Sequence, residues 1–96
     1  AVLTPTWPFA APGIGAQSVT IGTRSIPIDP HRNCFVRAAN AIDACALTLP
    51  MGLYECARVP AGLHLTAQGG TERTLLALAR AAEACLPALP AVRVPD

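Results

Sequence analysis

The sequence predicts a small α+β domain of the split βαβ type (βαββαβ, ferredoxin-like), a plait in which two helices cover one face of a four-stranded antiparallel sheet and two disulfides staple the fold. Three observations lead to this prediction: the length of 96 residues suits one hydrophobic core, strand-like and helix-like periodicities follow one another along the chain, and there are four cysteines. We expect an extended Pro-rich N-terminal arm over residues 1–17 and a single disulfide-stapled domain over residues 18–96.

The composition excludes several classes of protein. Apolar residues make up 52% of the chain and charged residues only 14%, which is too hydrophobic for an intrinsically disordered protein. No apolar run approaches the ~18 residues that a transmembrane helix needs. A net charge of +1 and scarce aromatic residues argue against a nucleic-acid partner. We therefore expect a compact domain with no transmembrane segment and no nucleic-acid partner.

The N-terminal arm, residues 1–17, combines prolines and glycines with no charge, so neither helical nor strand periodicity survives in it. Within it, Trp7 and Phe9 flank Pro8. The two rings either cover the domain's own apolar surface or form an exposed contact for a partner or a second copy of the chain.

Residues 18–28 alternate between apolar and polar side chains and predict the first strand, with a bulge at Gly22 and with Pro27 at the strand end or on a sheet edge.

Asp29 and Pro30 then predict the N-cap and first position of a helix that runs to Leu49 and ends before Pro50. Its apolar stripe has helical spacing and consists of Phe35, Ala38, Ala39, Ile42, Cys45, Ala46 and Leu49.

Residues 52–59 and 63–68, separated by a Pro-Ala-Gly turn, predict a β-hairpin. On its second strand Leu65 shares one face with its apolar neighbours. His64 and Thr66 lie on the opposite face, which we expect to be the open face of the sheet.

A Gly-Gly pair then precedes Thr71, which predicts the N-cap of a second helix with Glu72 in its first turn. The tail over residues 91–95 alternates and predicts a final short strand. The apolar stripe of the second helix consists of Leu75, Leu78, Ala79, Ala82 and Leu86.

The even cysteine count in a short chain favours disulfides, and the spacing argues against zinc; free buried thiols are the other alternative. Cys34 and Cys45 on one helix lie roughly 16 Å apart, whereas a disulfide needs Cα atoms within about 7 Å. Cys34 therefore pairs with Cys56 or Cys85. The antiparallel helices of the plait favour Cys34–Cys85 and Cys45–Cys56.

Which sheet face carries Tyr54 and Arg58 is left open. A bond from Cys45 to Cys56 turns these two side chains inward, together with Cys56. In the other register they lie on the open face beside His64.

Disulfides and the start AVLTP, without an initiator Met or a basic leader, are interpreted as a secreted mature protein whose signal peptide has been removed. The chain has no nucleophile-elbow motif and no phosphate-binding glycine loop, so we expect no enzymatic activity, no catalytic residue, no cofactor and no metal. The candidate binding residues are Trp7, Phe9, Tyr54, Arg58 and His64.

The predicted function is a secreted, disulfide-stabilised binding protein of the toxin or effector type that acts through protein or cell-surface contacts, with self-association through the arm. In size and element order the predicted architecture is similar to small secreted killer toxins and effector proteins of fungi. Two alternatives remain: a carrier of a small apolar ligand or lipid, and a subunit or inhibitor of a larger assembly.

Overall fold

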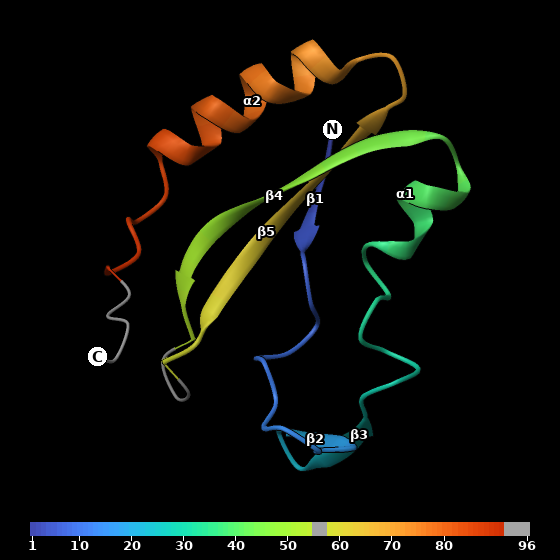
Figure 1. Cartoon of the computed structure of the whole chain (residues 1–96), viewed down its shortest axis with the longest axis vertical. Coiled ribbons are helices and arrows are strands. Elements are labelled where there is room, and N and C mark those ends of the chain that lie inside the picture. The colour runs from blue at the N-terminus through green and yellow to red at the C-terminus, as the bar shows by residue number, and fades with distance from the viewer. Residues whose placement is uncertain (55–57, 92–96) are drawn as a thin grey trace.

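The computed structural model describes residues 1–54 and 58–91. Two antiparallel sheets and two helices make up the described part (Figure 1): β1, β5 and β4 form a three-stranded sheet in that order, and β2 pairs with β3 in a separate hairpin. The elements in chain order are β1 (Val2–Pro5), β2 (Ser18–Ile21), β3 (Arg24–Pro27), α1 (Arg37–Ala41), β4 (Ala44–Leu53), β5 (Pro60–Gln68) and α2 (Glu72–Ala84). The predicted four-stranded ferredoxin-like plait is wrong.

The register of the three-stranded sheet gives its two faces different side chains. Leu65 on the central strand β5 lies opposite Leu3 of β1 and Leu47 of β4, and we call these three residues the leucine row. The next residue along, His64, lies opposite Thr4 and Thr48. Since neighbouring residues of a strand point to opposite faces, this polar row, Thr4–His64–Thr48, lies on the other face of the sheet. The predicted separation of Leu65 from His64 is confirmed.

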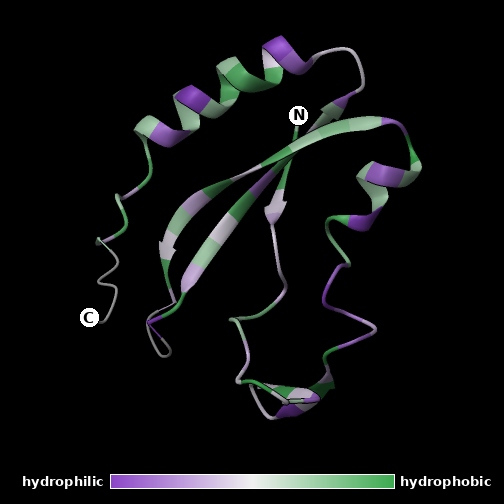
Figure 2. Ribbon diagram, viewed as in Figure 1, coloured by the Kyte–Doolittle hydropathy of each residue, from purple (hydrophilic) through white to green (hydrophobic). Residues whose placement is uncertain are grey.

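Helix α2 packs against β4 and β5 (Figure 1), and a contact next to its start places it on the face of the leucine row. The Oγ1 atom of Thr71, the residue before α2, lies 3.8 Å from the Sγ atom of Cys45, which shares that face. Leu75 and Ala79 are the buried residues of α2, and Leu65 is only 2% exposed. Figure 2 shows hydrophobic and hydrophilic residues alternating along α2, as expected for a helix with one buried side.

The predicted helix over residues 30–49 is wrong. Turns occupy residues 29–36, α1 has only five residues, and Asp43 then takes a left-handed conformation with φ of 52° that ends it. The apolar residues that follow belong to β4. The sequence predicts a helix there because an alanine-rich segment fits both a helical and a strand period. Asp29 does not cap a helix and instead pairs with Arg32 at 3.7 Å. Pro50 lies inside β4, at a register shift against β5, where a missing N–H is tolerated.

Two further predictions near the N-terminus need correction. Residues 18–28 form a hairpin and not one strand, because Gly22 adopts a φ of 62° in the turn between β2 and β3. The start of the arm, residues 2–5, is itself a strand of the main sheet. Pro27 does lie at a strand end, as predicted.

The prediction of a second helix is confirmed by α2, although the Thr71 side chain makes no cap hydrogen bond to it. The Thr71 hydroxyl instead donates to the Gln68 carbonyl at 2.6 Å. On the apolar stripe, Leu75 and Ala79 are buried while Leu78 is exposed. The predicted C-terminal strand falls almost wholly on residues outside the described part.

The predicted disulfides are wrong. Cys34 and Cys85 are free and exposed, and Cys45 is free and half-buried. The predicted pairing depended on a helix that carries both Cys34 and Cys45, whereas Cys45 lies on β4. The Cys45 thiol donates to the Gln68 carbonyl at 3.3 Å and forms no disulfide. Cys56 lies outside the described residues. Without the predicted Cys34–Cys85 and Cys45–Cys56 bonds, the reason for classing the chain with secreted toxins and effectors falls away, and secretion stays an untested prediction.

Candidate functional site

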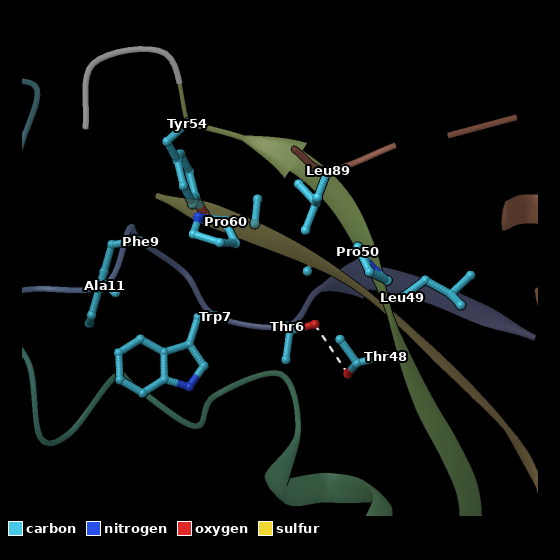
Figure 3. Close-up of a pocket in the computed structure, with 12 residues that line it drawn as sticks. Thr6, Trp7, Phe9, Ala11, Thr48, Leu49, Pro50, Tyr54, Pro60 and Leu89 are labelled. Carbon is cyan, nitrogen blue, oxygen red and sulfur yellow. Dashed lines mark hydrogen bonds between the residues drawn. The ribbon is translucent and has the colours of Figure 1, made fainter. Parts of the chain in front are cut away.

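A pocket of about 400 Å³ lies beside the end of the β4–β5 hairpin (Figure 3). The segment that follows β1 forms one wall, and β4, β5 and the chain after α2 form the rest. This volume is within the range of small-molecule sites, which are mostly apolar with a few polar groups. The lining residues are Thr6, Trp7, Phe9, Ala11, Thr48, Leu49, Pro50, Tyr54, Pro60, Ala61, Gly62 and Leu89.

The aromatic wall comes from the predicted N-terminal arm. The Thr6 N–H donates to the Gly62 carbonyl at 2.9 Å, which continues the β1–β5 pairing and fixes the segment that follows. The rings of Trp7 and Phe9 then meet edge to face, with their centroids 5.7 Å apart. Phe9 is buried and Trp7 half-buried. Of the two interpretations of these rings, the structure supports contact with the protein's own surface for Phe9.

Backbone hydrogen bonds after the end of β4 position Tyr54 on another wall. The Tyr54 N–H donates to the Val59 carbonyl at 2.9 Å, and the Arg58 N–H donates to the Tyr54 carbonyl at 2.8 Å. Arg58 adopts a left-handed φ of 55° and is exposed. It does not line this pocket, so the structure brings Tyr54 together with the two arm aromatics but leaves Arg58 outside.

The polar end of the pocket is formed by two threonine hydroxyls. The Thr6 hydroxyl donates to Thr48 Oγ1 at 3.3 Å (Figure 3), and Thr48 Oγ1 lies 3.4 Å from His64 Nδ1. The absence of a side chain at Gly62 makes room for the two threonines. A Cβ at that position would lie 2.6 Å from Thr6 Oγ1 and 2.9 Å from Thr48 Cγ2. The pocket therefore has an apolar body and one hydroxyl-bearing end.

His64 lies behind that end and does not line the pocket itself. It is only 6% exposed, which corrects the expectation that it faces solvent on an open sheet. Its Nε2 atom and the Thr4 hydroxyl are buried and have no hydrogen-bond partner among the described residues. Among the described residues, no third group contacts the ring in the way that the orienting group of a catalytic triad does.

Within residues 1–54 and 58–91, no three side chains of the metal-ligating types cluster together. In the same part of the chain, neither helix has the length and apolar character needed to cross a bilayer.

Sequence reasoning named Trp7, Phe9 and Tyr54 but missed the threonines. The side chains of Thr6 and Thr48 meet only because β1 and β4 pair with opposite edges of β5. No local pattern signals this long-range register. A weak signal was available in the alternation of residues 44–49, which places Thr48 on the opposite face from its apolar neighbours.

Comparison with known proteins gives one similarity over a short region. No protein-family model matches the chain, and no solved structure matches it. A fatty acid amide hydrolase of Arabidopsis thaliana is 33% identical over 86 residues, which make up 90% of this chain and 14% of that protein. The chain therefore spans about one seventh of the length of this curated relative, and the similarity concerns a segment of it.

Proposed function

We propose that the chain is a non-catalytic unit that binds the apolar chain of a small amphipathic ligand in the pocket beside the β4–β5 hairpin. The observation that carries the proposal is the pocket lining, which joins aromatic and aliphatic side chains to only a few hydroxyls. Burial of a hydrocarbon chain against such walls is favourable by roughly 25 cal/mol per Å² of apolar surface removed from water.

The similarity to a fatty acid amide hydrolase supports the same ligand class. The molecule in that protein's name has an apolar chain and a polar amide end, and the pocket offers a matching apolar body and polar end. The Thr48–His64 pair beside the pocket has no orienting partner on Nε2 among the described residues, and the role we assign to the chain itself is binding without catalysis.

The single tryptophan of the protein lies in the pocket wall and provides the test. We expect decanamide to change Trp7 fluorescence in a saturable manner, whereas acetamide, which has no hydrocarbon chain, has no effect at the same concentration. Equal responses to both amides, or no response to decanamide, would contradict the proposal.

A matched pair of variants locates the ligand. Leu89→Asp places a carboxylate in the pocket and is expected to weaken decanamide binding about tenfold or more, because the charge must be desolvated. Leu86→Asp is the control, since Leu86 is also half-buried and lies on the same segment but does not line this pocket. It should leave the affinity within about twofold of the unmodified chain.

A second candidate function is attachment to a larger protein body, and two exposed leucines that flank the buried stripe of α2 on either side favour it. Leu76 and Leu78 are 60% and 44% exposed, and the similar segment of the relative belongs to a much longer chain. If the chain replaces the matching segment of the Arabidopsis protein, we expect amide hydrolysis to persist. Leu76→Glu with Leu78→Glu should abolish it, and persistence of activity in this double variant would contradict the attachment.

A further inference from the structure

The two hydroxyls at the polar end of the pocket are joined by a hydrogen bond of defined direction. The Thr6 hydroxyl donates its proton to Thr48 Oγ1. His64 Nδ1 lies 3.4 Å from Thr48 Oγ1, and which of these two atoms donates depends on the imidazole tautomer. The Thr6 proton is used on Thr48 in either tautomer.

This direction decides what the polar end offers to a ligand. Because Thr6 uses its only hydroxyl proton on Thr48, its oxygen faces a ligand with lone pairs and no proton. Thr6 is half-exposed and lines the pocket, so these lone pairs are accessible. A head group that donates an N–H or O–H finds a partner here, whereas one that only accepts does not.

The surroundings hold the two threonine hydroxyls in place. The His64 ring beside Thr48 is only 6% exposed and is confined by its neighbours. Gly62 keeps the threonines together, since a Cβ there would lie 2.6 Å from Thr6 Oγ1.

We propose that the Thr6–Thr48 hydroxyl pair selects amphipathic ligands whose head group donates a hydrogen bond to Thr6 Oγ1. This inference rests on the proposed function, because it requires that a ligand occupy the pocket. It adds the chemical class of the head group, which the apolar walls do not determine.

The test compares decanamide, whose amide nitrogen bears protons, with N,N-dimethyldecanamide, which only accepts hydrogen bonds. Binding is followed at neutral pH by Trp7 fluorescence and, independently, by titration calorimetry. We expect the unmodified chain to bind decanamide about twofold to tenfold more tightly, the range that one hydrogen bond supplies.

Two variants separate hydrogen bonding from the greater bulk of the dimethyl compound. Thr6→Val removes the acceptor, and Gly62→Ala displaces it while leaving every polar group present. Both should bring the affinity ratio close to one and still bind the two compounds. Thr66→Val, on the same sheet face of β5 but away from this pocket, is the control and should keep the preference.

Equal affinity of the unmodified chain for both amides would overturn this inference alone, and so would a preference that survives Thr6→Val. No binding of either amide would overturn the proposed function and this inference with it. Circular dichroism of each variant shows that its fold is intact; if Gly62→Ala unfolds the chain, Thr6→Val decides.

Discussion

The leucine row and the polar row lie on opposite faces of the same three strands, one residue apart along each strand. Leu65 is 2% exposed and His64 is 6% exposed, so the centre of both rows is buried. The two rows differ in the interactions that their buried atoms require. The leucine row needs only apolar contact, which α2 supplies, whereas two polar atoms of the other row have no partner among the described residues. The two faces are therefore alike in burial at their centre and differ in whether their buried atoms are satisfied.

The largest expected effect is on the leucine row. Leu65→Ala should lower the free energy of unfolding by about 2–5 kcal/mol, because it removes apolar contact and leaves a cavity under α2. Urea denaturation followed by circular dichroism measures it. Leu3→Ala in the same row is the control, since Leu3 is 58% exposed and should cost less than about 1 kcal/mol. Similar losses for both variants would show that α2 does not cover the centre of this row.

A smaller effect of opposite sign is expected on the polar row. Thr4→Val keeps the side-chain shape and removes a buried hydroxyl that has no partner. We expect the free energy of unfolding to rise by about 1 kcal/mol, because an unpaired buried hydroxyl carries a desolvation cost. The control is Thr20→Val on β2, which is exposed and should change stability by less than about 0.5 kcal/mol. A clear loss of stability in Thr4→Val would mean that this hydroxyl has a partner.

The contrast between the rows was only half visible in the sequence. The alternation in residues 63–68 separated Leu65 from His64 correctly, because a strand has a strict period of two. The partners of Leu65 and His64 in the two rows could not be predicted, since they depend on the pairing of β5 with β1 and β4. Alanine-rich residues 38–46 satisfied a helical stripe equally well, and the short strand β1 was hidden by Pro5 at its end.

The pocket shows the same limit. Trp7, Phe9 and Tyr54 stand out by their size and scarcity, so composition alone made them candidates. Thr6 and Thr48 have no such signal, because their role comes from a contact between residues far apart in the chain. The disulfide prediction failed for a related reason: it depended on a helix that the structure replaces with turns and a strand.

The smallest expected effect concerns the cysteines. Since Cys34, Cys45 and Cys85 are free, a reducing agent should leave the urea midpoint unchanged. A thiol reagent should label Cys34 and Cys85 rapidly and Cys45 more slowly, because Cys45 is half-buried on the face of the leucine row and its thiol donates to a carbonyl. Peptide mass spectrometry after timed labelling gives the order. If Cys45 reacts as fast as Cys34, the Cys45 thiol is accessible to solvent and α2 does not shield this end of the leucine-row face.

The most direct test of the division between the two faces is a decanamide titration followed by backbone amide chemical shifts in two-dimensional NMR. The account predicts saturable shifts at Thr6, Thr48 and Gly62, together with the Trp7 indole N–H, and none at Leu75 or Ala79 of α2. Shifts confined to α2 and the leucine row, or no saturable shift at the polar end of the pocket, would contradict it.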